Sequence, residues 1–406
     1  MSKLPLEDIR VIDFSWVLAG PFATRMLADM GAQVIKIESR RKIDGLRAYG
    51  PWRGEPTPPE LGCGLFDLYN RNKLSIALDL TTPGGLEICK RLIAIGDIVV
   101  ENYSVRGMEK FGLQYPVLQK INPRIVMISM AGLGQTGPYR EYISFGPTLQ
   151  ALSGMSVLVG FPDRDPVGIG NSYPDHTAAV HAVIAVLAAL DSRERTGKGQ
   201  HIDLSQYESV TGLLGPQIMD YVANGRVPQR MGNRLPSASP HGCYRCQGDD
   251  RWCVISVFND AEWQSLCKVM DKPALARDPK FATVQGRVSN SDELDRLVES
   301  WTVKYPPEEV MERLQKAGVA AGVVQNIEDL MVRDPQIKAR GYYQEVEHPV
   351  TGVSALEGLP FQFSNLSWSM RSAAPILGEH THQVLAEILK MPEEEIERFA
   401  QEGVFE

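Results

Sequence analysis

The stretch from Ile9 to Ile37, IRVIDFSWVLAGPFATRMLADMGAQVIKI, contains two short apolar runs separated by a helical pattern. Ile9–Phe14 and Gln33–Ile37 are rich in valine and isoleucine, the residues that favour buried strands. Between them, Pro21–Met30 has the apolar spacing of a helix. Two parallel strands need a crossover of this kind, so the stretch predicts the first β-α-β unit of a parallel sheet.

The same alternation continues along the chain. Strands are expected at Leu74–Leu78, Asp97–Glu101, Arg124–Met130 and His201–Ser205, and a helix is expected from Thr81-Thr82-Pro83 to about Ile95. Strands that alternate with helices predict an α/β fold with a doubly wound parallel sheet. Ligands of such sheets lie beyond the carboxyl ends of the strands. In this chain those ends carry Ser15-Trp16-Val17, Glu38-Ser39-Arg40 and Glu101-Asn102-Tyr103.

The pattern changes after Gln200. Residues 203–224 are expected to be helical, and Gly225–Gly242, rich in glycine, proline, arginine and serine, is expected to be a linker or loop. Beyond it we expect a strand at Trp252–Phe258, helices at Asp260–Met270, Asp292–Trp301 and Pro306–Ala317, and short β segments with a last helix pair after Leu377. We therefore predict a large domain at 1–200 and 327–406, a linker region at 201–242 and a smaller α+β domain at 243–326.

Bulk composition limits the function classes. The chain has 406 residues, 43% of them hydrophobic, and a net charge of −8. The acidic balance argues against general nucleic-acid binding, which needs a basic face. The sequence contains neither a run of about 18 apolar residues nor the apolar stretch of a signal peptide. We therefore expect a cytoplasmic protein that does not act at a membrane.

Two local motifs suggest a bound group, and their context argues against both. Cys243 and Cys246 have metal-ligand spacing, but a structural zinc site normally has a second pair, so we expect free thiols in a strand-rich segment and no metal. Gly132–Gly137 matches GxGxxG after a strand. Pro138 follows at once, without the apolar pattern that opens a helix, so we expect a loop that shapes a substrate cleft rather than a nicotinamide or flavin site.

A local positive cluster contrasts with the acidic total. Its members are Lys36, Arg40, Arg41, Lys42, Arg47, Arg53, Arg71 and Lys73. A solvated face is the usual environment of lysine and arginine. Several members follow expected strand ends, however, where an arginine fork can hold phosphate. The second interpretation predicts a phosphorylated ligand.

Asp175 is the candidate catalytic residue. It follows Pro174 and precedes the apolar run Thr177–Leu190, which we expect to be a long buried helix beginning at or just after Asp175. A carboxylate there faces unpaired backbone N–H groups and the positive end of the helix dipole, so it should be ionised and fixed in orientation. Aspartate is also a preferred N-cap, and a purely capping role is the alternative.

The histidines near Asp175 are not obvious partners for it. His176 is its neighbour in sequence, and adjacent helical side chains point in different directions. His181 lies inside the apolar run, where we expect a hydrogen-bonded core histidine. The absence of a GxSxG sequence leaves an α/β-hydrolase triad without support.

Taken together, these segments resemble the class III CoA-transferases, the family of formyl-CoA transferase and carnitine CoA-transferase. The resemblance spans nearly the whole chain, in order. The matching segments are Val11–Phe14, Val17–Pro21, Gly31–Glu38, Asn70–Ile76, Val100–Tyr103, Gly132–Tyr139, Asp175, Arg195–Gln200 and Leu377–Thr381.

The resemblance implies a Rossmann-like large domain, a small central domain, and two chains threaded through each other as interlocked rings, either as a homodimer or with a paralogous subunit. It implies no tightly bound cofactor; coenzyme A enters as part of the acyl-CoA substrate, and a carboxylic acid is the second substrate. Asp175 matches the family's nucleophilic aspartate. The positions that match CoA contacts are Trp16, Val17, Ala19, Arg40, Asn72, Lys73, Asn102, Tyr103 and Met108.

The implied chemistry is a covalent relay. The Asp175 carboxylate attacks the donor thioester, CoA thiolate then attacks the aspartyl carbonyl, and the acceptor acid takes CoA from the aspartyl thioester through a second anhydride. Backbone N–H groups near Gly134, Gly168 or Gly170 are candidates for stabilising the oxyanions. Succinyl-CoA as donor and a bulky or aromatic dicarboxylate such as benzylsuccinate as acceptor form our substrate hypothesis, based on the apolar side chains of Trp16, Phe145 and Tyr173.

Two alternative functions remain. An α-methylacyl-CoA racemase shares the fold but needs an acid/base pair, and its histidine would fall at Phe145, which cannot transfer protons. A non-catalytic CoA-binding subunit of a heteromeric transferase is the other alternative, which the presence of Asp175 disfavours. Formyl-CoA transferase has a Tyr-Glu pair where Phe145-Gly146 aligns, and a flexible glycine-rich loop without a close counterpart at Gly232–Gly242. We therefore expect acceptor handling to differ from that of the oxalate enzyme.

Overall fold

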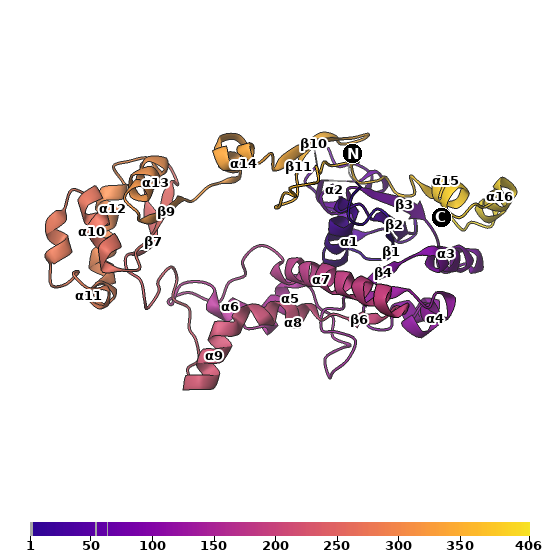
Figure 1. The fold of residues 1–406 in the computed structure, drawn as a ribbon, viewed down its shortest axis with the longest axis horizontal. Coiled ribbons are helices and arrows are strands. Elements are labelled where there is room, and N and C mark those ends of the chain that lie inside the picture. The colour runs from indigo at the N-terminus through magenta and orange to yellow at the C-terminus, as the bar shows by residue number, and fades with distance from the viewer. Residues whose placement is uncertain (1–2, 53–54, 63) are drawn as a thin grey trace. The chain divides into compact units, whose positions relative to one another are not determined.

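The computed structural model describes residues 3–52, 55–62 and 64–406. The chain forms two compact units (Figure 1). Among these described residues, the large unit contains those within 1–156, 168–226 and 338–406, and the small unit contains 157–167 and 227–337.

A six-stranded parallel sheet forms the centre of the large unit, as the alternating pattern predicts. The strand order is β3-β2-β1-β4-β5-β6. β1 pairs with β2 on one side and with β4 on the other, so Val11 lies opposite both Val34 and Ile98. The order therefore reverses between β1 and β4, which makes this the switch point at which such sheets bind ligands. The strands are β1 (Arg10–Asp13), β2 (Gln33–Glu38), β3 (Lys73–Ala77), β4 (Ile98–Glu101), β5 (Val126–Ser129) and β6 (His201–Asp203).

Two buried clusters cover the two faces of this sheet, because successive strand residues point to opposite sides. Val11 and Val34 pack with α1 and α7. Ile12 and Ile35 pack with α3 and the C-terminal helices on the other face. The helices of the large unit are α1 (Ala19–Asp29), α2 (Gly64–Asn70), α3 (Pro83–Ile95), α4 (Tyr115–Ile121), α5 (Gly146–Leu152), α7 (Tyr173–Thr196), α8 (Gln206–Thr211), α9 (Gly215–Asn224), α15 (Thr381–Gln383) and α16 (Glu393–Gln401).

The remaining part of the large unit is a hairpin of β10 (Tyr343–His348) and β11 (Gly352–Glu357). Two short helices, α6 (Met155–Leu158) and α14 (Pro335–Ala339), include residues of both units. The small unit has an antiparallel sheet of β7 (His241–Arg245), β8 (Trp252–Ser256) and β9 (Ala320–Val323). Four helices pack around a core that includes Trp263 and Leu294: α10 (Asp260–Val269), α11 (Val284–Ser289), α12 (Ser291–Thr302) and α13 (Pro307–Lys316).

The segment at 201–242, expected to be a linker region, is divided between the units. Residues 201–226 form β6, α8 and α9 in the large unit, and residues 227–242 belong to the small unit. The register that pairs Ile128 with Ile202 makes β6 an edge strand of the main sheet. Sequence periodicity cannot show this pairing, because it joins segments more than 70 residues apart.

Helix α7 differs from its expected form in two ways. It begins at Tyr173 rather than at or after Asp175, because Pro174 in the first turn needs no backbone N–H partner. It is also not wholly buried. Ala178 and Ala182 face the core, whereas Val180 and Ile184 are exposed. Among the described residues, α7 alone is long and apolar enough to cross a membrane by length and composition.

Candidate active site

Asp175 lies in the first turn of α7, at the meeting point of three helix N-termini. Its carboxylate accepts a hydrogen bond from the Ser172 hydroxyl, and two backbone N–H groups, its own and that of Ala19 at the start of α1, favour its ionised form. Gly146 begins α5, and a Cβ placed there would lie 2.7 Å from Asp175 Oδ2. The starts of all three helices, whose N-terminal ends carry partial positive charge, therefore lie close to this carboxylate.

The surroundings of Asp175 make it a more basic carboxylate than an exposed aspartate. Burial raises its pKa, and the Ser172 hydroxyl, His176 and the two backbone N–H groups partly oppose that shift. The helix N-termini expected from the sequence are present and favour the ionised carboxylate, but burial has the larger effect and the pKa of Asp175 is raised. A higher pKa accompanies greater nucleophilicity, while the Ser172 hydrogen bond orients the carboxylate.

His176 supports the site without serving as its base. Its Nδ1 donates to the Ser172 carbonyl at 2.7 Å, and its Nε2 lies 3.2 Å from the Tyr69 hydroxyl. The ring also packs against Phe22, with centroids 5.1 Å apart. Both ring nitrogens are occupied, and the sequence expectation that His176 is no base for Asp175 agrees with this geometry.

The loop between β1 and α1 connects Asp175 with the switch point of the sheet. Asn102, beyond the end of β4, accepts from Trp16 N–H at 2.8 Å and donates to the Trp16 carbonyl at 2.7 Å. Asp44 accepts from Val17 N–H at 3.0 Å and holds that β-branched residue at a φ of 63°. A non-glycine residue in this region is strained, and such strain is concentrated at ligand sites.

A pocket of about 390 Å³ opens at the carboxyl ends of β1 to β4. Trp16 and Tyr103 form an aromatic corner with ring centroids 5.6 Å apart. Lys42 Nζ lies 5.0 Å from the Trp16 ring. The pocket, called the switch-point pocket below, is lined by Trp16, Ile37–Ser39, Arg41, Lys42, Leu78–Thr81, Tyr103, Ser104, Gly107, Lys110 and Phe111. It combines cations for phosphate with apolar surfaces for a ring.

A comparison with protein families shows which family this chain belongs to. The model of CoA-transferase family III matches residues 6–381. The chain belongs to this family. A succinyl-CoA–D-citramalate CoA-transferase of Chloroflexus aurantiacus is 36% identical over 393 residues, which are 97% of this chain and 96% of that relative. A succinate–glutarate CoA-transferase of Agrobacterium fabrum is 36% identical over 399 residues, 98% of each chain.

The fold comparison agrees with the family assignment. A crystal structure of a CAIB/BAIF family protein from Brucella suis matches with a TM-score of 0.87 at 35% identity, covering 95% of this chain and 100% of that chain. The resemblance found in the sequence motifs is thus confirmed, and this family III protein is an enzyme that transfers CoA.

The structure brings some of the expected CoA-contact residues to the switch-point pocket of this CoA-transferase and not others. Trp16 and Tyr103 line it, and Val17, Ala19 and Asn102 belong to or support the adjoining loop. Arg40 is exposed beside the lining residues, and Met108 is buried and lines a neighbouring pocket. Asn72 and Lys73 lie at the amino end of β3, the opposite edge of the sheet from this pocket.

The positive cluster divides into two groups. Its buried members are paired with carboxylates and hold the core together: Lys36 with Asp44 at 3.0 Å, Arg47 with Glu38 at 2.8 Å, Arg71 with Asp29 at 2.8 Å and Lys73 with Asp13 at 3.1 Å. Arg41 and Lys42 line the switch-point pocket. Arg53 lies outside the described residues. Both interpretations of the cluster are therefore incomplete, because four of its seven described members are neither solvated nor facing the pocket.

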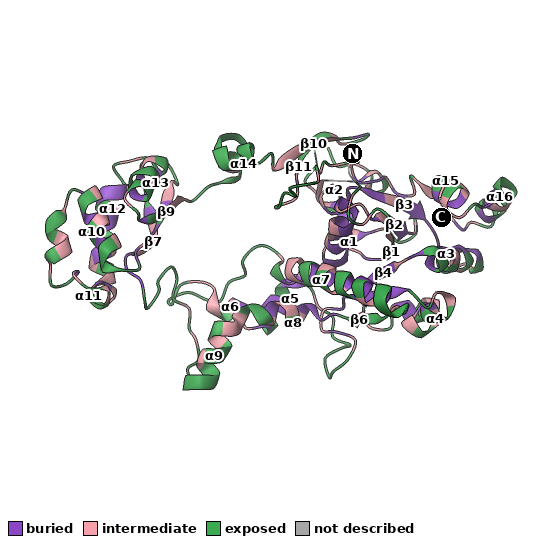
Figure 2. Ribbon diagram, viewed as in Figure 1, coloured by how far each residue is buried: buried purple, intermediate pink, exposed green. Residues whose placement is uncertain are grey.

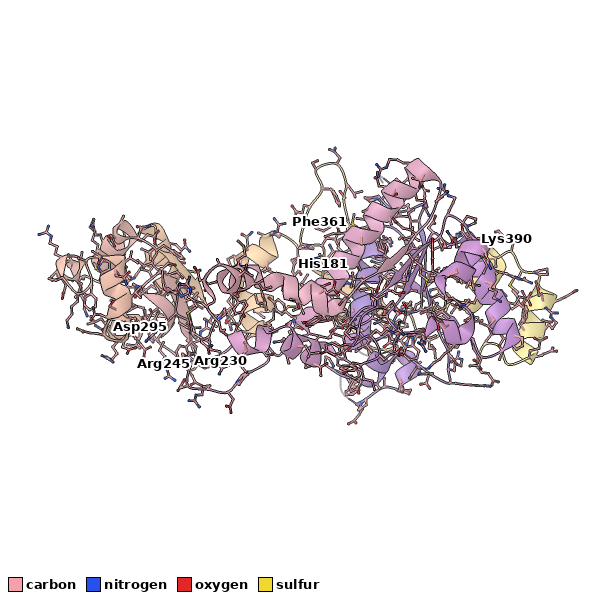
Figure 3. All side chains as sticks on the ribbon, turned by 90° about the horizontal axis from the view of Figure 1, so that it is seen from below. His181, Arg230, Arg245, Asp295, Phe361 and Lys390 are labelled. Carbon is pink, nitrogen blue, oxygen red and sulfur yellow. The ribbon has the colours of Figure 1, made fainter. Side chains whose placement is uncertain are left out.

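Several remaining expectations are also resolved. No described helix begins within Gly132–Gly137, so this loop is not a dinucleotide motif. His181 is exposed on the outer face of α7, with Nδ1 donating to the Thr177 carbonyl at 2.8 Å, and the core role expected for it is wrong (Figure 3). Cys243 and Cys253 lie in paired strands as free thiols; Cys63 is outside the described residues.

Sequence reasoning did not identify three residues of the site. Lys110 is charged and follows the motif around Tyr103, so its position offered a signal. Ser172 lies three residues before Asp175, a spacing typical of hydroxyl contacts in a first helical turn. Gly146 offered no local signal, since its proximity to Asp175 depends on how α5 packs beside α7.

Proposed function

We propose that this enzyme exchanges CoA between succinyl-CoA and a dicarboxylic acid through covalent intermediates on Asp175. The observation that carries the proposal is the β1–α1 loop. Its Trp16 lines a pocket with three cationic side chains suited to CoA, and the backbone N–H of Ala19 at its other end favours the ionised form of Asp175. One short, clamped segment therefore connects ligand binding to the candidate nucleophile.

The CoA moiety occupies the switch-point pocket in this proposal. Its phosphates lie against Arg41, Lys42 and Lys110, and the aromatic corner of Trp16 and Tyr103 packs against its apolar parts. The Trp16, Val17, Ala19, Asn102 and Tyr103 roles suggested by the resemblance fit this placement. Arg40, Asn72, Lys73 and Met108 stay as proposed contacts that the geometry of this pocket does not support.

The reaction then proceeds in four balanced steps. An oxygen of Asp175 attacks the donor carbonyl, CoA thiolate leaves, and an anhydride forms. The thiolate attacks the aspartyl carbonyl, which releases succinate and leaves an aspartyl-CoA thioester. The acceptor carboxylate displaces the thiolate to form a second anhydride. The thiolate attacks the acceptor's acyl carbon, giving the new acyl-CoA and free Asp175.

Each step passes through an oxyanion, and the converging first turns of α1, α5 and α7 supply N–H dipoles near Asp175. Three glycines were expected to stabilise the oxyanions. Gly168 and Gly170 lie in open surroundings, and Gly134 lies near Asp203. The proposal therefore places the oxyanion contacts at the helix starts rather than at those glycines.

The relatives support the choice of substrates. Their names specify succinyl-CoA or succinate together with D-citramalate or glutarate, all compact dicarboxylates or their thioesters. Two side chains that suggested an aromatic acceptor do not form an enclosed apolar cleft, because Phe145 is 67% exposed and Tyr173 is 41% exposed. We therefore favour compact acceptors, with benzylsuccinate as the contrasting outcome.

A substrate panel tests this proposal. Succinyl-CoA is mixed with glutarate, citramalate, malate, oxalate or benzylsuccinate, and acyl-CoA products are identified by mass. Product from compact dicarboxylates supports the assignment, whereas transfer confined to benzylsuccinate or oxalate contradicts it. Exchange of an α-proton without CoA transfer would instead indicate the racemase.

We also propose that two chains assemble as an interlocked dimer. Helix α9 has no buried residue, and its apolar Met219, Tyr221 and Val222 are 72%, 57% and 78% exposed (Figure 2). Exposed apolar surface on this scale is typical of protein interfaces. Sedimentation of the enzyme alone distinguishes a homodimer from a subunit that needs a different partner.

A further inference from the structure

A chain of hydrogen bonds runs beneath the switch-point pocket and has no part in the chemistry described above. It begins at Glu101, the last residue of β4, which is 3% exposed. Glu101 accepts from the Tyr103 backbone N–H at 2.8 Å. Ser129, which is 2% exposed, lies opposite Glu101 in the paired strands, and its hydroxyl lowers the pKa of Glu101. Ser129 Oγ lies 3.0 Å from His201 Nε2, and His201 is exposed on the edge strand β6.

The number of protons fixes the direction of these bonds. Serine has one hydroxyl proton, which goes to the Glu101 carboxylate. His201 Nε2 must then carry the proton that it shares with Ser129 Oγ. The imidazole ring stacks on Tyr115 with centroids 5.4 Å apart and planes at 16°. The arrangement thus joins a buried acid to a positioned imidazole at the surface.

A cavity gives the chain access to solvent. Glu101, Ser129 and His201 all line a pocket of about 300 Å³ at the carboxyl ends of β4 and β5. Ser104 and Gly107 line both this pocket and the switch-point pocket. The segment that carries Tyr103 is therefore the partition between the two.

We propose that Glu101, Ser129 and His201 form a proton relay that positions Tyr103 and makes CoA binding depend on the protonation of Glu101. These are positioning residues, and the inference rests on the proposed CoA site. A proton that binds His201 Nδ1 releases the Nε2 proton to Ser129 Oγ, and the hydroxyl proton passes to Glu101. Glu101 then donates a hydrogen bond to Ser129, and Ser129 donates one to His201 Nε2. The donor and acceptor of each of these two hydrogen bonds have exchanged roles.

Protonation weakens the anchor of Tyr103. The ionised carboxylate makes a charge-assisted bond to its N–H, and the protonated acid leaves only a neutral bond. Tyr103 packs edge-on against Trp16, so a looser Tyr103 also loosens the aromatic corner of the CoA pocket. Burial raises the pKa of Glu101 to about 7, so its charge changes near neutral pH. CoA should therefore bind more weakly as the pH falls through about 7.

The groups around Glu101 raise or lower its pKa according to their charge and hydrogen bonding. Asp203 on β6 raises the pKa of Glu101, and the Ser129 and Tyr103 hydrogen bonds lower it. Arg106, Glu109 and Arg140 also line the cavity, with Arg106 and Arg140 both directed at Glu141. Asp13 on the adjacent β1 is paired with Lys73. Asp203 is thus the neighbour whose charge opposes ionisation.

The test is the dissociation constant of CoA measured calorimetrically from pH 5.5 to 8.5 in wild type and in Glu101→Gln. Glutamine reproduces the protonated acid, because its amide group donates to Ser129 and its carbonyl accepts from Tyr103. The affinity ratio of wild type to variant should rise from near one at low pH to roughly fivefold at high pH. The titration of CoA's own phosphates is common to both proteins and cancels in the ratio.

Two further variants separate a titrating Glu101 from a merely structural contact. Asp203→Asn removes a repelling charge and should move the midpoint to lower pH. Ser129→Ala removes a donor to the carboxylate and should move it to higher pH. A structural role would lower affinity equally at every pH and leave the midpoint fixed.

A ratio that is flat from pH 5.5 to 8.5 would overturn the relay. Lys110→Gln shows whether the CoA assignment has failed instead, because it should weaken binding at every pH. If the affinity ratio is flat but Lys110→Gln still weakens CoA binding, only the relay is rejected. No loss in Lys110→Gln rejects the pocket assignment and the relay together.

Discussion

Gly146→Ala probes the tightest contact of the candidate active site. A Cβ at this position would overlap Ser172 Oγ and lie 2.7 Å from Asp175 Oδ2, whereas ordinary contact begins at 3.4 Å. The carboxylate oxygen must therefore move by about 0.7 Å, and the Ser172 hydroxyl must rotate away from it. The single added methyl group both displaces the proposed nucleophile and removes a hydrogen bond that orients it.

The size of the effect follows from these two changes. A hydrogen bond to a charged group contributes about 1.5–3 kcal/mol, which is about 10-fold to 150-fold in rate. Displacement of a reacting group by about 1 Å costs on the order of 100-fold. We expect kcat for CoA transfer to fall about 100-fold, while the KM for acyl-CoA stays within about twofold, because the switch-point pocket is untouched.

Steady-state kinetics with succinyl-CoA and the best acceptor of the panel measure both constants. Gly212→Ala is the matched control: its Cβ meets nothing within 4 Å and its φ is −58°, so its kinetics should equal those of wild type. Ser172→Ala removes the hydrogen bond without crowding and should cost about 10-fold or more. A folded Gly146→Ala enzyme with kcat within twofold of wild type would refute the geometry derived for Asp175.

Three other changes have defined outcomes. Lys110→Gln should raise the KM for acyl-CoA about tenfold with little change in kcat, while the exposed Lys120→Gln should leave both unchanged; equal KM values would remove Lys110 from the phosphate site. Val222→Glu should shift sedimentation toward single chains, and an unchanged mass would exclude α9 from the interface. Glu101→Gln should raise the free energy of unfolding by about 3 kcal/mol at pH 8 but not at pH 4, as measured by denaturant melts. The pKa of Glu101 is about 7 in the folded protein against 4.5 for a free glutamate, so the wild-type protein loses stability as the pH rises through 7, whereas the glutamine variant does not; equal stability of the two proteins at pH 8 would contradict this.

Local pattern was sufficient for the elements of the large unit. The apolar runs around Val11, Val34 and Val126 became β1, β2 and β5 within about two residues of the expected limits. The helix start at Thr82-Pro83 was also correct, since Thr82 caps α3 through its hydroxyl. These features depend on neighbouring residues, and the sequence contains that information directly.

Contacts between segments that are distant in the sequence could not be predicted from local sequence patterns. The fate of each cation depended on a carboxylate elsewhere in the chain, as with Arg71 and Asp29. The exposed position of His181 depended on which face of α7 meets α1. Asp175 was correctly singled out as a helix-terminal carboxylate, but its crowding by Gly146 follows from the packing of two helices and has no local signature.

The most direct test of the central claim follows oxygen from the acceptor acid into the protein. Turnover with ¹⁸O-labelled acceptor carboxylate should place label in the Asp175 side chain, because the second anhydride leaves an acceptor oxygen on the aspartate when it collapses. Mass spectrometry of the peptide containing Asp175 should show that gain only when succinyl-CoA is also present. Efficient CoA transfer with no label in that peptide would contradict covalent catalysis by Asp175.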